Sequence, residues 1–172
     1  LLPKPKTIKE QDGQMLLCHS THIVMTKEVA ETEMHAAKRL QEAIRQETGL
    51  ILPFSVGEVR EGDLSLGIAK TLPEQTYEIT IDEKGGQISG GDGAGVLYGV
   101  ETFCQIVQQC GGILPCVQIQ DAPDMPNRGY YFDQTRGRVL KLEELKKIAG
   151  RMSLYKLNQL RLYVEHTYLF RD

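Results

Sequence analysis

Two pairs of charged side chains near the end of the sequence are of types that can do chemistry. Asp133 and Arg136 are three residues apart, and Glu165 is followed directly by His166. A carboxylate next to an imidazole can move protons, although a lone Glu-His pair is more often a satisfied hydrogen-bonded pair. The spacing of Asp133 and Arg136 predicts a local ion pair that holds a loop.

A glycine-rich stretch, Gly90–Gly95, precedes a predicted helix and invites comparison with phosphate-binding loops. Glycines before a helix N-terminus can form an anion site because the first backbone N–H groups lack partners. This stretch lacks both the dinucleotide-binding glycine pattern with its acidic ribose ligand and the Gly-Lys-Ser/Thr of a P-loop. Asp92 would also repel a phosphate. We therefore expect a tight strand-to-helix turn here and no cofactor.

The cysteines and histidines show no metal-ligand spacing. No C-x-x-C pair occurs, and His19, His22 and His35 do not cluster, so we expect no metal. We interpret the cysteines as reduced and mostly buried thiols. A disulfide among three of them is the alternative for an exported protein. The cysteines are Cys18, Cys104, Cys110 and Cys116.

The composition is that of a globular chain and excludes several classes of partner. The 172 residues are 41% hydrophobic and 25% charged, with a net charge of -3. Binding to nucleic acids or to anionic membranes would need an excess of basic residues, which this chain does not have. No apolar run approaches the roughly 20 residues that span a bilayer. No signal peptide is visible in residues 1–8. Two compartments therefore remain: the cytoplasm, or an exported location reached after removal of a signal peptide.

The first two thirds of the chain alternate strand and helix patterns. Short strands are predicted over 15–18 and 23–25. Apolar residues at three- and four-residue steps over 34–44 then predict a helix that Thr26 caps and Gly49 ends.

Further elements follow before a proline-rich boundary at 121–126. Together they predict an α+β fold, a mostly antiparallel sheet with two helices on one face, in a domain over 1–122. These elements are a strand over 64–69, a hairpin of strands 77–81 and 87–89, a helix over 96–107 and a strand over 116–120.

The rest of the chain, 123–172, has the pattern of one βαβ unit. A strand over 130–132, a helix over 142–152 and a strand over 160–164 predict two parallel strands. Such a unit cannot bury both faces of its sheet alone. We therefore expect the chain to end inside a larger fold and to self-associate through this unit, unless the unit packs on the first domain.

Several segments, in their order and spacing, resemble family 20 glycoside hydrolases. The family combines a non-catalytic N-terminal domain with a (β/α)8 catalytic barrel. The similar segments are Leu1–Lys6, Tyr77–Ile81, Gly93–Thr102, Leu114–Pro123, Met125–Gly129 with Asp133 and Arg136, and Tyr155–Asn158.

The resemblance implies a hydrolase of terminal N-acetylhexosamine glycosides, in which the acetamido group of the substrate is the nucleophile. A paired Asp-Glu after the fourth barrel strand would orient that group and protonate the leaving oxygen. A barrel needs roughly 250 residues, so residues 123–172 correspond to a truncated barrel, its first βαβ unit. We expect the catalytic pair to lie outside these 172 residues, a carbohydrate substrate for the intact enzyme, and no activity of this chain alone.

The resemblance also assigns candidate substrate-binding residues. Arg128 would reach sugar hydroxyls, and a domain-interface salt bridge is the alternative. Asp133 and Arg136 would lie at the active-site end of the first barrel strand, although the local ion pair remains slightly favoured. Glu165 and His166 would lie at that end of the second strand, where many relatives carry His-x-x-Asp-Asp. The sequence departs from that pattern here, and this puts the family's usual substrate specificity in doubt.

Two other functions stay open. The chain fits a non-catalytic accessory or interaction domain of a carbohydrate enzyme, which packs against a partner or itself. It also fits a hydrolase of a related glycoside family, because such families carry a similar N-terminal domain. A parent chain with an Asp-Glu pair would favour the glycosidase.

Overall fold

The computed structural model describes residues 1–25 and 31–165, so Thr26 and His166 lie outside the described residues. The chain divides into two compact units, Leu1–Asp124 and Met125–Asp172. We call them unit 1 and unit 2 and describe each by itself.

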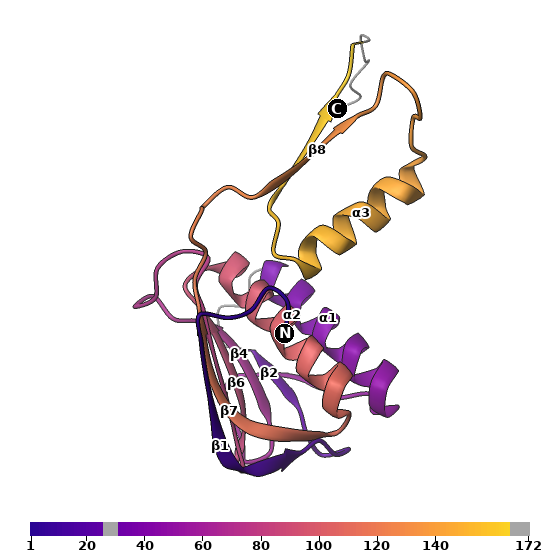
Figure 1. The fold of residues 1–172 in the computed structure, drawn as a ribbon. Helices are drawn as coiled ribbons and strands as arrows, with labels where there is room; N and C mark the ends of the chain where they lie inside the picture. The colour runs from indigo at the N-terminus through magenta and orange to yellow at the C-terminus, as the bar shows by residue number, and fades with distance from the viewer. Residues whose placement is uncertain (26–30, 166–172) are drawn as a thin grey trace. The chain divides into compact units, whose positions relative to one another are not determined.

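Unit 1 is a sheet with two helices against one of its faces (Figure 1). The described helices are α1, Glu31–Thr48, and α2, Gly93–Cys110. The described strands are β1 (Thr7–Leu16), β2 (Ile23–Met25), β3 (Phe54–Val56), β4 (Leu64–Ile68), β5 (Tyr77–Asp82), β6 (Gly85–Gly90) and β7 (Ile113–Asp121).

The sheet of unit 1 has the strand order β1-β7-β5-β6-β4-β2-β3. Three neighbouring pairs are antiparallel, β1 with β7, β7 with β5 and β5 with β6. The other three pairs are parallel. The α+β class is thus confirmed, but the sheet is mixed rather than mostly antiparallel. One of the parallel pairs, β2 with β3, arises because α1 is a crossover that returns the chain parallel to β2.

The core of unit 1 lies between the sheet and the helices. Along β5, Tyr77, Ile79 and Ile81 are buried, while Glu78 and Thr80 between them are half-buried. This alternation follows from the period of a strand, which points successive side chains to opposite faces. From the helices, Leu40 and Phe103 are among the residues that are fully buried against it.

The glycine-rich stretch is a tight turn into α2, as predicted. Asp92 caps the helix, and its Oδ1 accepts hydrogen bonds from the Gly95 backbone N–H at 2.7 Å and the Gln75 backbone N–H at 3.0 Å. A Cβ on Gly91 would lie 1.9 Å from the Pro73 carbonyl oxygen. The glycine therefore serves close backbone packing, and the Asp92 carboxylate occupies the place at the helix N-terminus that an anion would take.

Unit 2 is a βαβ unit. Its strands β8, Gly129–Asp133, and β9, Gln159–Tyr163, pair in parallel with Asp133 opposite Tyr163, and α3, Leu142–Leu154, connects them. The predicted parallel pairing is confirmed. Within α3 only Met152 is buried, and Leu142 is 64% exposed. Much of the apolar surface of unit 2 is therefore uncovered.

Candidate functional site

Polar side chains gather where β8 and β9 end. Because the two strands are parallel, their carboxyl ends lie at one edge of the sheet, where ligands bind in open α/β sheets. The Gln134 backbone N–H donates to the Tyr163 carbonyl oxygen at 2.9 Å, and the Glu165 N–H donates to Thr135 Oγ1 at 2.8 Å. These bonds join the two segments that follow the strands.

Asp133 and Arg136 form the predicted local ion pair. Asp133 Oδ2 lies 3.0 Å from Arg136 Nε. Its Oδ1 accepts hydrogen bonds from the backbone N–H groups of Thr135 at 2.8 Å and Arg136 at 3.1 Å. These backbone bonds, and then the Arg136 side chain, lower the pKa of the Asp133 carboxyl below its usual value. The carboxylate thus holds the turn that carries Arg136.

Tyr163 links the ion pair to Glu165. The Arg136 guanidinium lies over the Tyr163 ring, 5.3 Å from its centroid, in a cation–π arrangement. The Tyr163 hydroxyl donates to Glu165 Oε1 at 2.8 Å, and this bond, more than burial, raises the pKa of the tyrosine. We call Asp133, Arg136, Tyr163 and Glu165 the edge cluster.

The edge cluster is suited to binding rather than to bond cleavage. Glu165 is exposed and presents carboxylate oxygens, which accept hydrogen bonds from hydroxyls or amides. Arg136 presents guanidinium donors in a fixed fork, and its side chain is 66% exposed. The cluster holds no Ser, Cys or Thr beside a base, the arrangement that activates such nucleophiles.

Gln134 is buried beside the edge cluster and has no counterpart among the sequence-predicted residues. It is 8% exposed, and its Oε1 accepts the Leu140 backbone N–H at 2.9 Å. Its Nε2 has no hydrogen-bond partner among the described residues. No sequence pattern marks this glutamine, because its burial depends on the loop over 134–140 folding back.

Arg128 lies at the other end of the two-stranded sheet from Glu165, because it directly precedes β8. Its Nε donates to the Lys156 carbonyl oxygen at 2.9 Å, and its Nη1 donates to the Met125 carbonyl oxygen at 2.6 Å. Its backbone N–H donates to Asn158 Oδ1 at 2.8 Å. The structure therefore does not bring Arg128 to the edge cluster, and sugar binding by Arg128 stays a prediction.

No metal-ligand set forms within residues 1–25 and 31–165, where no three His, Cys, Asp or Glu side chains gather at a metal-binding distance. In the same residues no helix is both long and apolar enough to cross a bilayer.

A family model and several named proteins match the chain. The model, described as glycosyl hydrolase family 20, domain 2, matches residues 1–122. A beta-hexosaminidase of Porphyromonas gingivalis is 27% identical over 183 residues, 99% of this chain and 23% of that protein. One of Vibrio furnissii is 29% identical over 160 residues, 92% of this chain and 25% of that protein. The chain thus spans about a quarter of the length of these relatives.

Solved structures share the fold. A family 20 beta-N-acetylhexosaminidase of Streptomyces coelicolor aligns with a TM-score of 0.82 at 24% identity, over 95% of this chain and 34% of that one. An exo beta-N-acetylglucosaminidase of Vibrio harveyi, solved in complex with N-acetylglucosamine, aligns with a TM-score of 0.79 at 21% identity, over 95% of this chain and 25% of that one.

Proposed function

The chain belongs to glycosyl hydrolase family 20, and on that premise we propose that it is part of a glycosidase that removes terminal N-acetylhexosamine residues. One observation carries the proposal. The similarity to the beta-hexosaminidase of P. gingivalis extends over 99% of the chain and so includes both units.

Within that enzyme, unit 1 is the non-catalytic accessory domain and unit 2 is the first βαβ unit of a (β/α)8 barrel. The parallel pairing of β8 with β9 supports this assignment, as does the exposed apolar surface of Tyr131 and Leu142. In a complete barrel, further strands and helices would cover such surface. The catalytic pair lies outside residues 1–172, so this chain alone is inactive.

The edge cluster faces the substrate, because active sites of such barrels lie at the carboxyl ends of the strands. There Glu165 accepts hydrogen bonds from sugar hydroxyls, and Arg136 donates to them. The placement of Arg128 at the opposite strand ends, with its donors on backbone carbonyls, favours a structural role for that arginine.

The test compares this chain with the longest natural chain that contains it, on a chromogenic N-acetylglucosaminide. We expect hydrolysis by the longer chain alone. Activity of the 172-residue chain would mean that the catalytic groups lie within it, and inactivity of both would overturn the proposed substrate.

Variants of the longer chain distinguish the proposed roles of Arg136 and Arg128. Glu165→Gln and Arg136→Lys should each raise KM or lower kcat/KM by about tenfold or more, because each removes a charge-assisted or bidentate contact. Arg128→Lys should reduce thermal stability and leave KM unchanged. If Arg128→Lys raised KM and left the stability unaltered, Arg128 would be a sugar-binding residue and not a structural one.

A further inference from the structure

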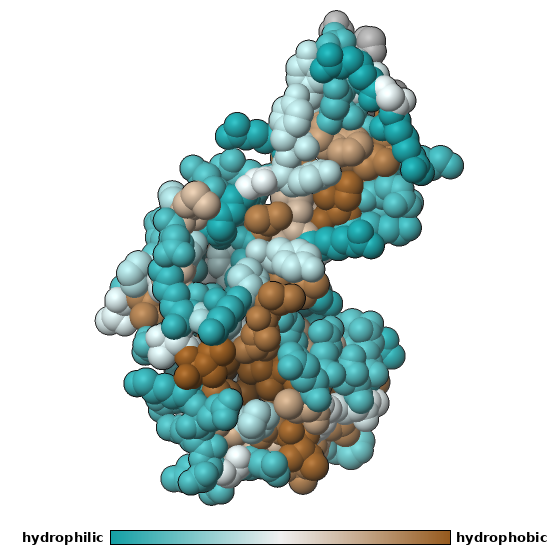
Figure 2. Space-filling view, in the orientation of Figure 1, coloured by the Kyte–Doolittle hydropathy of each residue, from teal (hydrophilic) through white to brown (hydrophobic). Residues whose placement is uncertain are grey.

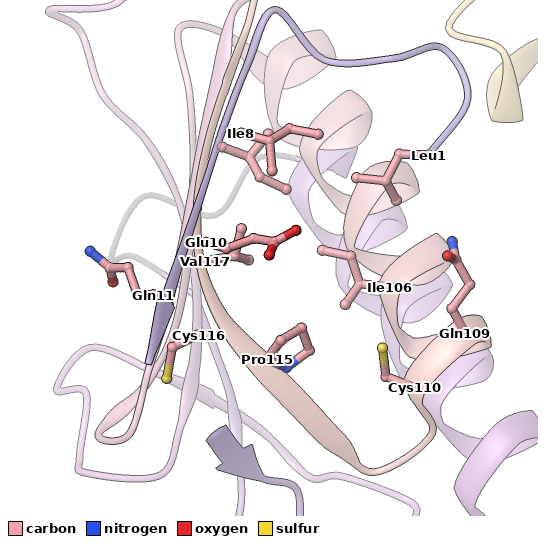
Figure 3. Close-up of a pocket in the computed structure, with 11 residues that line it drawn as sticks. Leu1, Ile8, Glu10, Gln11, Ile106, Gln109, Cys110, Pro115, Cys116 and Val117 are labelled. Atoms are coloured by element: carbon pink, nitrogen blue, oxygen red, sulfur yellow. The ribbon is translucent and has the colours of Figure 1, made fainter. Parts of the chain in front are cut away.

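A cavity of about 410 Å³ lies within unit 1, between the β1–β7 edge of the sheet and the C-terminal half of α2 (Figure 3). Ile8 and Val117 line it from the sheet, Ile106 and Cys110 from the helix, and Leu1 from the first residues of the chain. An apolar area lies over this part of the molecule in the space-filling view (Figure 2).

The cavity follows from the sheet topology. The helix α2 packs mainly on β6 and β5, in the middle of the sheet, whereas β1 is the edge strand beyond β7. The register sets Ile8 opposite Ile119 and Glu10 opposite Val117, so the helix-facing side of β1 carries Ile8 and Glu10. Because α2 does not extend over these residues, a hollow remains.

Hydrogen bonds fix the wall on the helix side. The Leu2 backbone N–H donates to Gln105 Oε1 at 2.7 Å, and Gln105 Nε2 donates to the Leu2 carbonyl oxygen at 2.6 Å. These bonds hold the first residues on α2 and keep Leu1 at the cavity. Its volume lies within the roughly 300–1,000 Å³ of small-molecule sites, which are mostly apolar and contain a few polar groups.

One charged side chain, that of Glu10, lines the cavity. Its carboxylate points toward the helix, whereas Gln11 and Cys116 point away to the other side of the sheet (Figure 3). Among the described residues, none forms an ion pair or hydrogen bond with the Glu10 carboxylate. An acceptor with a full negative charge is thus available beside apolar walls.

We propose that this cavity binds a small amphipathic amine, with its apolar body between Ile8, Ile106 and Val117 and its protonated nitrogen at Glu10. At about 30 Å³ for each water-sized group, the volume admits roughly ten to fifteen non-hydrogen atoms. Burial of the apolar body supplies most of the affinity. The carboxylate selects the sign of the head group, since it attracts a cation and repels an anion.

This binding site lies apart from the edge cluster and does not depend on the proposed glycosidase activity. Its test uses three probes with the same eight-carbon tail, n-octylammonium, n-octanoate and 1-octanol. Binding is followed by NMR on the backbone amides of β1 and α2. It is also followed by protection of the exposed Cys110 from iodoacetamide in a Cys18→Ser background.

We expect octylammonium to bind at least about fivefold more tightly than octanoate, because an exposed ion pair supplies up to about that factor and the same carboxylate repels octanoate. We also expect octylammonium to slow alkylation of Cys110. Glu10→Gln should bring the ratio close to one. Glu58→Gln makes the same change of charge in a loop outside the cavity and should leave the ratio unaltered. Ile8→Trp, at an exposed position of the edge strand, fills the cavity and should weaken all three probes.

The proposal is overturned if octanoate or octanol binds as tightly as octylammonium. It is equally overturned if no probe protects Cys110, or if Glu10→Gln leaves the preference unchanged in a variant whose NMR spectrum shows the native fold.

Discussion

At the scale of single residues, Asp92 is the side chain on which the start of α2 depends. Its carboxylate accepts hydrogen bonds from two backbone N–H groups, that of Gly95 in the helix and that of Gln75 in the preceding loop. One short acidic residue therefore caps the helix and ties it to the segment before β5.

We predict that Asp92→Ala lowers the free energy of unfolding of unit 1 by about 1 kcal/mol, the usual value of a lost N-cap. Urea unfolding measured by circular dichroism checks this. Asp12→Ala, an exposed aspartate in β1, is the matched control and should change stability by less than about 0.5 kcal/mol. Equal effects of the two variants would contradict the capping role.

The stabilisation of the turn by Asp133 depends on pH, and the hydrogen bonds of its carboxylate determine the direction of that dependence. Its folded-state pKa is lowered by the N–H groups of Thr135 and Arg136, so the carboxylate form stabilises the turn. This stabilisation is present above the ordinary value of 3.8 and is lost as the pH falls through the lower folded-state pKa.

We therefore predict that the Thr135 and Arg136 amide resonances stay constant down to about pH 4 and shift below it. An NMR titration of unit 2 resonances measures this. In Asp133→Asn the same amides should show no such step. A midpoint above 3.8 in the native chain would mean that the turn does not stabilise the carboxylate.

At the scale of elements, Arg39 and Glu101 connect α1 to α2. Arg39 Nε lies 3.2 Å from Glu101 Oε1, and Nη2 lies 3.3 Å from Oε2. The Glu101 side chain is 2% exposed and that of Arg39 is 39% exposed. A buried carboxylate requires such a partner, because an isolated buried charge is costly.

A double-mutant cycle with Arg39→Ala and Glu101→Ala should give a coupling free energy of about 1 kcal/mol, since the arginine remains partly in water. The exposed pair of Glu42 and Arg45, one turn of α1 away, is the control. Its coupling should be clearly smaller, because both side chains lie in water, which screens the pair. If both cycles give the same value, burial of Glu101 does not strengthen the pair.

The elements that could be predicted are those whose evidence is local. Alternation predicted the hairpin of β5 and β6, and the helical spacing predicted α1 and α2. The ten-residue strand β1 was recognised only at its end, because Lys9 to Gln14 are polar, as an exposed edge strand permits. The parallel pairs of unit 1 were missed because strand direction in a sheet depends on how distant segments meet.

In the candidate site, too, the features with local sequence evidence could be predicted, and those that depend on distant segments could not. Asp133 and Arg136 are three apart, and their ion pair followed from that spacing. The contact of Arg136 with Tyr163 and the bond from Glu165 to Thr135, 30 residues apart, arise only when β8 and β9 pair. Sugar binding by Arg128 stays a prediction, because the sequence does not reveal at which end of the strand the arginine side chain lies.

At the scale of the whole molecule, unit 2 leaves apolar side chains in water. The exposed apolar residues of unit 2 include Met125, Tyr130, Tyr131, Val139, Leu142, Tyr155 and Leu162. Surface of this kind favours association, because its burial releases about 25 cal/mol per Å².

We predict that the 172-residue chain self-associates through unit 2, so that its mean mass in sedimentation equilibrium rises with concentration. Leu142→Lys should weaken this association, because it places a charge on the exposed face of α3. Ile51→Lys, at a residue of unit 1 that is 67% exposed, should leave it unchanged. A monomer at all concentrations would contradict the prediction.

The pairing of β1 with β7 has a consequence for the connectivity of unit 1. These are the first and last strands of the unit, and Thr7 lies opposite Gln120, with the Lys6 backbone N–H 3.3 Å from Asp121 Oδ1. The chain therefore enters and leaves the unit at one place, the arrangement that makes circular permutation and domain insertion tolerable. A short linker can join these ends, and new termini can be opened in the loop between β3 and β4. Because the two ends lie close together, unit 1 can also be inserted into a surface loop of another protein.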